Sequence, residues 1–467
     1  MPDTMSRFII AGTHSGVGKT TITSALIRAL KKRGHDIQPF KVGPDYIDPG
    51  YHTLASGRNT RNLDGWMLTP EQVIEVMARN TPEGGFALTE GVMGLYDGYS
   101  ADSIEGSTAH IAMITGTPVI LVVDGSKMAR SAAAVVLGYK MLEKDLNIGA
   151  VIFNRLGGQR HYELLKKAVE PLNIPVLGYF PREENTKLPE RHLGLVPTSE
   201  MQELEKFLDH WGEMAEKYLD IDRMVNLFSH NTSLKLPHNP TMPGEYAEPR
   251  CNLAVVKDEA FTFYYPENLE LLEARGASIV EISLLEDRGL PPDCHGLYIG
   301  GGFPEMFAPR LSQNDSMRKS IEKAAREGMP VYGECGGFMY LTRGVKDFEG
   351  NTYPLAGLFD CTAVMCSQRQ ALGYALARTR IDNFLTLKDE ETKGHEFHWS
   401  EINFEGLEEQ EGLDKFVYSF PNKGNRQDGL LYKNVLGSYV HLHFYSNPAI
   451  AHRFVEACVK YRDNTDK

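Results

Sequence analysis

The chain has 467 residues, more than one ordinary domain holds, so two domains are expected. Apolar residues at 42% and charged residues at 24% are typical of a soluble globular protein. No apolar run approaches the roughly 20 residues that a membrane span needs. The formal net charge of −13 argues against a general nucleic-acid binder but not against an anionic small substrate.

The cysteines and the first residues indicate where the protein works. Six cysteines lie in the second half without metal-like or paired spacing, and the polar start shows no secretory signal. A reducing cytoplasm is therefore the expected location.

Strand-like and helix-like segments alternate through the first half. The apolar run 8–10 leads into a helix-like segment at 24–30, and the later strand-like stretches are "DIQPFKVG", "FALTEGVMGLYDG", "TPVILVVDG" and "NIGAVIFNRL". This alternation predicts a parallel sheet covered by helices on both faces. Residues 1–222 are assigned to this doubly wound α/β domain.

The first strand is followed by the glycine-rich loop "AGTHSGVGKTTIT". Glycines let backbone N–H groups approach phosphates, and the helix that follows adds a favourable dipole. Lys19 can reach the β- and γ-phosphates, and the Thr20 hydroxyl can ligate Mg²⁺. The strict motif has glycine at position 13, where this chain has Thr13 and carries its glycine one place earlier. The predicted nucleotide-binding residues are Thr13, Gly16, Val17, Gly18, Lys19, Thr20 and Thr21.

Carboxylates follow the next strands, at the sheet edge where open α/β folds bind ligands. Asp45 and Asp48 come after one strand, Glu90 and Asp97 after another, and Asp124 ends a third. Acids beside phosphates need a hard cation between them, and Mg²⁺ is the natural one. The alternative is that some of them cap helices or turns. The predicted metal ligands are Thr20, Asp45, Asp48 and Glu90.

Residues 223–250, rich in Pro, Asn and Ser, read as a linker. A second α/β pattern fills 251–467, with helices expected around 267–275 and 315–328 and β structure in "KFVYSF" and "VLGSYVHLHF". The fold class is thus α/β in two domains.

The stretch "GECGG" at 333–337 places Cys335 between an apolar run and a helix-like run. Flanking glycines permit the sharp strand-to-helix turn that exposes a nucleophile. The helix N-terminus is expected to lower the thiol pKa. The alternative is a buried apolar cysteine.

Two other blocks supply partners for such a thiol. "YIGGGFPE" offers the N–H groups of Gly301 and Gly302 for an oxyanion. "GSYVHLHF" offers His441 and His443, two residues apart and so on one face of a strand.

These blocks, in order, resemble the cobyrinate a,c-diamide synthase family, in which a dethiobiotin synthetase-like domain is fused to a class I glutamine amidotransferase domain. The resemblance runs nearly end to end through "AGTHSGVGKTT", "KVGPDYIDPGYH", "EGVMGLYDG", "LPERHLGLVPTSE", "GGGFPE", "GECGGFMYL", "GHEFHWS" and "GSYVHLHF". It implies use of ATP, Mg²⁺ and L-glutamine to amidate two acetate side chains of cobyrinate or a related metallo-tetrapyrrole. It also suggests a homodimer.

The resemblance implies that Cys335 is the glutaminase nucleophile and His441 its partner. Many class I enzymes carry a carboxylate two residues after that histidine, but His443 stands there, so the third role stays unassigned. The remaining candidates, as groups facing the substrate or supporting the site, are Asp97, Arg191, His192, His395 and His398.

Pairing the two sites makes chemical sense, because a carboxylate becomes reactive towards ammonia once it is converted to an acyl phosphate. Three alternatives remain open from sequence. They are nickel-sirohydrochlorin as the macrocycle, a cobyric acid synthase amidating other positions, and a P-loop partitioning ATPase with an idle amidotransferase tail.

Overall fold

The computed structural model describes residues 4–182, 198–229, 231–404 and 413–465. The chain divides into two compact units, Met1–Pro240 and Thr241–Lys467, so the division falls inside the predicted linker 223–250. The first part of that segment is not a linker in form. Helix α8 (Ile221–Phe228) and strand β8 (Asn231–Thr232) belong to the first unit, because a short amphipathic helix buries Met224 and Phe228 there.

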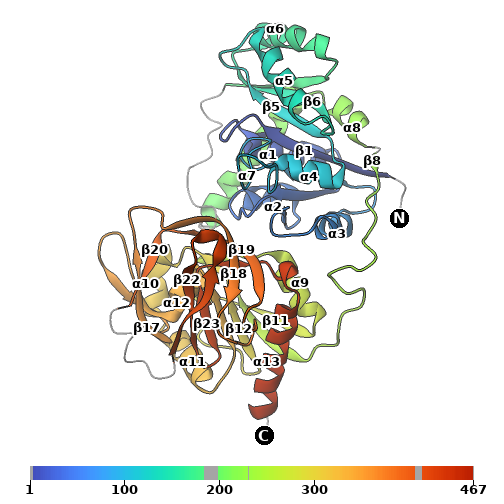
Figure 1. The fold of residues 1–467 in the computed structure, drawn as a ribbon. Coiled ribbons are helices and arrows are strands. Elements are labelled where there is room, and N and C mark those ends of the chain that lie inside the picture. The colour runs from blue at the N-terminus through green and yellow to red at the C-terminus, as the bar shows by residue number, and fades with distance from the viewer. Residues whose placement is uncertain (1–3, 183–197, 230, 405–412, 466–467) are drawn as a thin grey trace. The chain divides into compact units, whose positions relative to one another are not determined.

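The first unit is built on a sheet with the order β3-β2-β4-β1-β5-β6-β7, whose neighbouring strands are all parallel (Figure 1). A short antiparallel pairing joins β8 to the start of β1. The central strand β4 is buried at every position, as expected for a strand covered on both faces. The strands are β1 (Thr4–Gly12), β2 (Ile37–Val42), β3 (Arg61–Leu63), β4 (Phe86–Glu90), β5 (Val119–Asp124), β6 (Ile148–Leu156) and β7 (Val176–Pro181).

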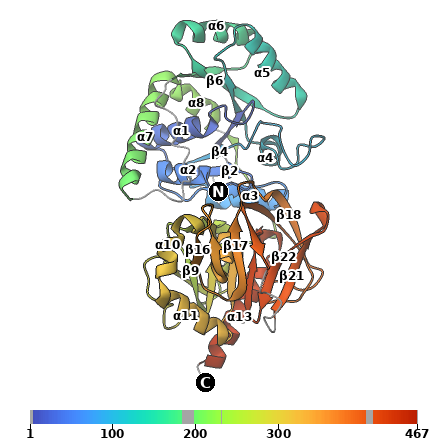
Figure 2. The same ribbon diagram turned by 90° about the vertical axis from the view of Figure 1, so that its left-hand side faces the viewer.

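Helices α1, α7 and α8 gather on one side of this sheet (Figure 2). Ile22 and Leu26 of α1 and Trp211 of α7 pack with strand residues in one continuous apolar cluster. The helices of the unit are α1 (Lys19–Lys32), α2 (Asp48–Ser56), α3 (Pro70–Asn80), α4 (Thr108–Thr115), α5 (Ser131–Leu142), α6 (Gln159–Val169), α7 (Thr198–Tyr218) and α8. The predicted doubly wound α/β fold is confirmed.

The second unit contains a long mixed sheet with the order β11-β9-β12-β14-β23-β22-β21-β18-β19-β24. Its first five strands are parallel and the remainder are antiparallel. These strands are β9 (Cys251–Val256), β11 (Ala277–Ile282), β12 (Gly296–Ile299), β14 (Val331–Glu334), β18 (Ala371–Thr379), β19 (Glu391–His398), β21 (Leu413–Phe420), β22 (Arg426–Tyr432), β23 (Val435–Ser438) and β24 (His441–Leu442).

Two smaller sheets complete the β structure of this unit, ordered β16-β15-β17-β20 and β10-β13. Their strands are β10 (Phe261–Phe263), β13 (Gly301–Gly302), β15 (Thr342–Lys346), β16 (Thr352–Pro354), β17 (Phe359–Met365) and β20 (Ser400–Asn403). The helices are α9 (Pro266–Ala274), α10 (Ala308–Gln313), α11 (Asp315–Arg326), α12 (Gly336–Leu341) and α13 (Ala449–Thr465). The helices and β segments predicted from the sequence in this half are confirmed.

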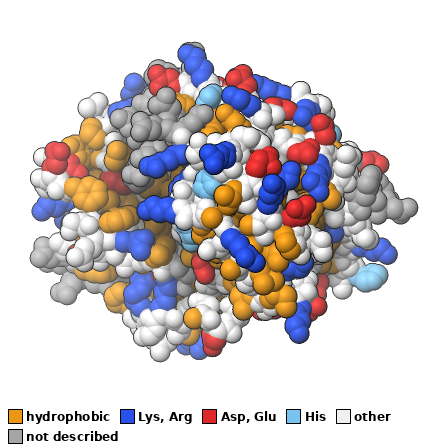
Figure 3. Space-filling model, turned by 90° about the horizontal axis from the view of Figure 1, so that it is seen from above, with side chains coloured by type: hydrophobic (Ala, Val, Ile, Leu, Met, Phe, Trp, Pro, Cys, Tyr) orange, Lys and Arg blue, Asp and Glu red, His pale blue; other side chains and the backbone are white. Residues whose placement is uncertain are grey.

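The charges on the surface and the character of the helices are those expected from the mixed-charge composition. On the face drawn in Figure 3, Lys and Arg side chains are intermixed with Asp and Glu side chains. Among the described helices, none has both the length and the apolar character required to cross a bilayer.

Candidate active sites

The glycine-rich loop of the first unit joins β1 to α1 and is fixed by the neighbouring strand β6. The Asn154 amide donates a hydrogen bond to the Val17 carbonyl at 2.7 Å. Gly18 has φ of 98°, and a Cβ there would lie 2.2 Å from Asn154 Nδ2. Only glycine therefore fits at this position, which presents the start of α1 to the ligand side of the sheet.

A cavity of about 1010 Å³ opens at this loop, at the carboxyl edge of the parallel strands. Its lining includes Gly16, Gly18, Lys19, Thr20 and Thr21, as predicted for a nucleotide site. The two other predicted loop residues, although both described, do not line it. The Val17 side chain is buried in the core, and Thr13 donates its N–H to the Val122 carbonyl at 3.2 Å.

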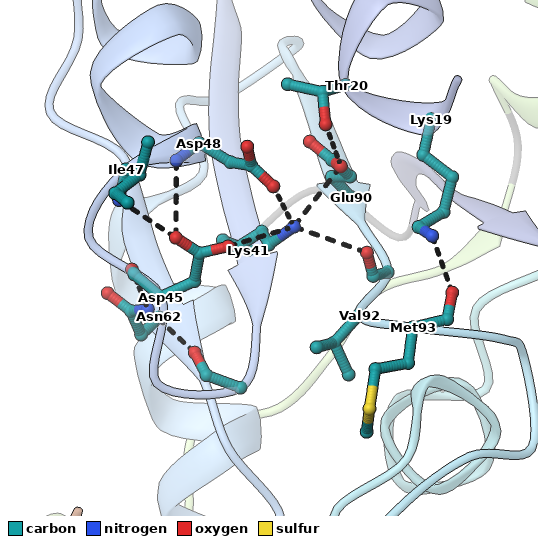
Figure 4. A network of polar contacts seen from close by, with 12 residues as sticks. Lys19, Thr20, Lys41, Asp45, Ile47, Asp48, Asn62, Glu90, Val92 and Met93 are labelled. Carbon is teal, nitrogen blue, oxygen red and sulfur yellow. Dashed lines mark hydrogen bonds and ion pairs between the residues drawn. The ribbon is translucent and has the colours of Figure 1, made fainter. Parts of the chain in front are cut away.

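The Lys41 ammonium lies at the centre of the acidic cluster, and sequence reasoning missed it (Figure 4). Its Nζ is 2.6 Å from Asp48 Oδ2, 3.2 Å from Glu90 Oε1 and 3.4 Å from Asp45 Oδ2. The side chain is only 2% exposed, so these are contacts of a desolvated charge. A lysine in the short strand "IQPFKV", which is buried at every position, was the available signal.

The charges in this cluster compensate one another. Burial alone would lower the pKa of Lys41, but Asp48, Glu90 and Asp45 outweigh it and raise that pKa well above its usual range. For Asp48, burial opposes and Lys41 dominates, so the pKa of its carboxyl is lowered. Burial, together with repulsion from Asp48, raises the pKa of Asp45 to about 6 despite Lys41.

The predicted metal ligands come together here but not as a ready cage. Thr20 Oγ1 donates to Glu90 Oε1 at 2.8 Å, and the other Glu90 oxygen contacts His52 Nε2. Within the described ranges, no group of three or more His, Cys, Asp and Glu side chains is arranged to hold a metal ion. Asp45 also accepts hydrogen bonds from the N–H groups of Ile47 and Asp48, so it fixes the turn that leads into α2.

The two other acids singled out in the first unit, Asp124 and Asp97, have structural partners. Asp124 Oδ2 pairs with Arg155 Nη1 at 2.8 Å, and Arg155 Nη2 donates to the Gly16 carbonyl at 2.6 Å. Asp97 accepts the Gly94 N–H at 2.9 Å, and Lys19 Nζ reaches the Met93 carbonyl of the same loop. Asp124 and Arg155 thus brace the phosphate loop from the edge of the cavity. Arg191 and His192 lie outside the described residues.

In the second unit Cys335 occupies the turn between β14 and α12. Its backbone has φ of 49° and ψ of −101°, a conformation that is strained for a residue with a side chain. A Cβ on Gly336 would lie 2.9 Å from the Gly302 nitrogen, and one on Gly337 would lie 2.1 Å from the Ile299 carbonyl oxygen. The glycines therefore permit the predicted nucleophile turn and bring Gly302 N–H against it.

The expected effect of the turn on the thiol is not observed. Cys335 is 5% exposed and packs in the apolar cluster of this unit. Burial raises the pKa of the thiol far above its usual range, and the nearby Glu305 carboxylate adds to the effect. The prediction that the helix N-terminus lowers this pKa is therefore wrong, because desolvation outweighs the dipole of a helix only six residues long.

The two histidine blocks come together in space. His395 on β19 pairs with His441 on β24, and their rings stack with centroids 4.8 Å apart. A Cβ on Gly301 would lie 2.3 Å from the His441 Cε1 atom, so this ring packs beside the Gly301–Gly302 segment. Burial lowers the pKa of His441 to about 3, so the imidazole is neutral at rest. His398 stacks on Tyr439 with centroids 3.9 Å apart.

Glu305, in the "GGGFPE" block, supplies a pH-dependent test of this region. Burial raises the pKa of its carboxyl from 4.5 to about 7. The folded state therefore holds this proton more tightly than the unfolded state. The stabilisation is complete below about pH 4.5 and is lost as the pH rises through about 7.

The free energy of unfolding should fall between pH 5 and pH 8 in the wild type. Glu305→Gln should make this fall smaller by about 2 kcal/mol, after allowance for the partial exposure of the side chain. Thermal unfolding of both proteins at the two pH values measures this. Glu322→Gln, at an exposed position on α11, is the matched control and should leave the difference unchanged. Equal slopes for wild type and Glu305→Gln would contradict the assignment.

Comparison with known proteins covers both units. Residues 8–196 match the CobQ/CobB/MinD/ParA nucleotide binding domain, and residues 252–449 match the CobB/CobQ-like glutamine amidotransferase domain. The chain is 46% identical over 454 residues to the cobyrinate a,c-diamide synthase of Dehalococcoides mccartyi strain CBDB1, covering 96% of this chain and 97% of the relative. The chain belongs to the cobyrinate a,c-diamide synthase family.

Other members of that family are almost as similar. The synthase of Priestia megaterium is 42% identical over 97% of both chains, and that of Thermoplasma volcanium is 42% identical over 97% of this chain and 98% of its own. Membership identifies the chain as a glutamine-dependent carbon–nitrogen ligase and confirms the predicted enzyme class and the two-domain α/β fold.

Proposed function

We propose that the protein amidates the a and c acetate carboxylates of cobyrinate, using ATP and glutamine. The observation that carries this proposal is the similarity to cobyrinate a,c-diamide synthases over 96% of the chain. It is supported by a glycine-rich loop with a large polar cavity in one unit and a cysteine turn in the other. The first unit would supply the activated carboxylate, and the second unit would supply the ammonia that reacts with it.

The first unit activates the acid. A substrate carboxylate oxygen attacks the γ-phosphorus of ATP, the bond to ADP breaks, and an acyl phosphate forms. Ammonia then attacks the acyl carbon, the C–O bond to the phosphate breaks, and loss of a proton from nitrogen gives the amide and free phosphate. This route replaces a poor oxide leaving group by phosphate.

Lys19 and the loop N–H groups are suited to hold the β- and γ-phosphates. Thr20 Oγ1 and Glu90 Oε1, 2.8 Å apart at the cavity, would hold Mg²⁺ together with phosphate oxygens, since this ion needs few protein ligands. When bound, Mg²⁺ neutralises charge that develops during phosphoryl transfer. Asp45 and Asp48, the other predicted ligands, are compensated by Lys41 and would lie around the ion rather than repel the nucleotide.

The second unit makes the ammonia. Cys335 Sγ attacks the side-chain carbonyl of glutamine while His441 accepts the thiol proton and passes it to the departing ammonia. Water then cleaves the thioester to release glutamate. The N–H groups of Gly301 and Gly302 are the proposed oxyanion donors, supported by the approach of Gly302 N to the cysteine turn.

Comparing macrocycles tests the function. Wild-type enzyme is incubated with ATP, Mg²⁺ and glutamine, together with cobyrinate in one set and nickel-sirohydrochlorin in another, and the amides are counted by mass. Two amides on cobyrinate are expected, with glutamate released in equal number. Preferential amidation of nickel-sirohydrochlorin would contradict cobyrinate as the substrate. ATP hydrolysis without glutamate release would favour a partitioning ATPase. The homodimer stays a prediction, tested by light scattering.

A further inference from the structure

In the glutaminase site, His441 lacks the carboxylate that the resemblance places two residues later. His443 stands at that position, fully buried, and accepts the Tyr445 N–H at its Nδ1 at 3.4 Å. Its ring stacks on Tyr265, with centroids 4.4 Å apart. The side chain that replaces the carboxylate therefore contacts the turn that follows it and Tyr265, the residue that precedes α9 (Pro266–Ala274).

His395, the other near neighbour, faces His441 in the wrong way to orient it. The two rings lie nearly parallel, at 14°, so His395 contacts the face of the imidazole and not its in-plane nitrogen lone pairs. The Nδ1 atom of His395 is 2.9 Å from the Tyr265 hydroxyl, and this contact holds its ring in place.

A carboxyl group approaches His441 from a different element, and burial raises the pKa of this carboxyl to about 8. Glu334, the last residue of β14 and the neighbour of Cys335 in sequence, has its Oε2 3.9 Å from His441 Nδ1. The carboxyl is held by the Tyr332 hydroxyl at 2.7 Å on Oε1 and the Tyr298 hydroxyl at 3.0 Å on Oε2. The Leu442 N–H, next to His441, also points to Oε1 at 3.3 Å. A buried acid with this many fixed partners has a defined position.

We propose that Glu334 is the positioning residue of His441 in glutamine hydrolysis. The Glu334 carboxyl lies 3.9 Å from Nδ1 in the resting structure, so a shift of about 1 Å would let its ionised form accept the Nδ1–H. Nε2 would then be left to take the proton from Cys335 Sγ. The carboxylate then stabilises the imidazolium until that proton passes to the departing ammonia. The cysteine and the group that steers its base are thus consecutive residues of one strand and turn. This inference rests on the proposed function of the second unit.

The decisive variant is Glu334→Gln, which keeps the shape of the side chain and an acceptor oxygen for one of the two tyrosine hydroxyls. Glutamine-driven turnover should fall about 10²-fold through kcat, with KM for glutamine changed less than about threefold. Amidation driven by ammonium salt should stay at the wild-type rate. Glu334→Asp should recover part of the loss, since it restores a carboxylate at a greater distance.

Asp258→Asn is the control, because Asp258 is a half-buried carboxyl whose oxygens accept the N–H groups of Ala260 and Leu284 in a turn of the same unit. It should lower thermal stability and leave kcat per folded enzyme unchanged. Full glutamine-driven kcat in Glu334→Gln, or equal loss of the ammonium-driven rate, would overturn the inference. A wild-type enzyme that releases no glutamate would instead overturn the proposed function.

Discussion

Cys335→Ser should lose glutamine-driven amidation by more than about 10³-fold and keep amidation driven by ammonium salt. The hydroxyl is a far weaker nucleophile than a thiolate, and His441, whose pKa burial lowers to about 3, is too weak a base to make up the difference. Serine fits the same strained turn, so the fold of the second unit should be unchanged. The two rates are measured on the same macrocycle preparation, by counting amides by mass and glutamate by a coupled assay.

Cys366→Ser is the control for this experiment, because Cys366 is a half-buried thiol with its Sγ near the Val364 carbonyl. It should keep both rates. If Cys335→Ser retains glutamine-driven turnover, the nucleophile is another residue. If it loses the ammonium-driven rate as well, the two half-reactions are not separable in the way proposed.

Lys41→Met should lower the free energy of unfolding of the first unit by about 3–5 kcal/mol at pH 8, because it leaves buried carboxylates without their counter-charge. Asp48 and Glu90 lie within 3.2 Å of the ammonium that the change removes. The pKa of Asp48, which Lys41 holds down, should then rise, so its protonation restores part of the stability and the deficit should shrink at pH 5. Denaturant unfolding at both pH values measures the deficit.

Lys140→Met provides the comparison, since Lys140 is an exposed lysine that donates to the Leu172 carbonyl. Its effect should stay within about 0.5 kcal/mol at either pH. A deficit for Lys41→Met that is small, or that does not depend on pH, would show that the acidic cluster does not rely on this ammonium.

The sequence predicted what short-range rules control. The strand, glycines and Lys19 of the phosphate loop, and the glycines around Cys335, are local signals with one structural solution each, and the structure shows both turns. In the structure Gly18 fits because Asn154, far along the chain, occupies the space of a Cβ. That contact is invisible to local reasoning, although the glycine it requires is not.

What the sequence could not supply depends on burial and on neighbours from other strands. The acids near Asp45 were predicted as metal ligands, but the ion that occupies their centre is the Lys41 ammonium, from a strand that reads as plain core. The thiol pKa was predicted from its helix, yet the surrounding cluster decides it. Nothing in the sequence singled out Glu334 beside Cys335, because its proximity to His441 depends on the position of β24 in the fold.

Strand β8 has a practical consequence for anyone dissecting the molecule. Thr232 and Asn231 pair with Thr4 and Met5, Arg7 donates to the Thr232 carbonyl at 2.6 Å, and the Asn231 amide donates to the Arg7 carbonyl. The first strand of the first unit and the segment that follows α8 are thereby held together by hydrogen bonds. A fragment that ends at residue 222 would lack β8, and the start of β1 would lose its hydrogen-bond partners. A fragment that ends at residue 240 would keep both strands.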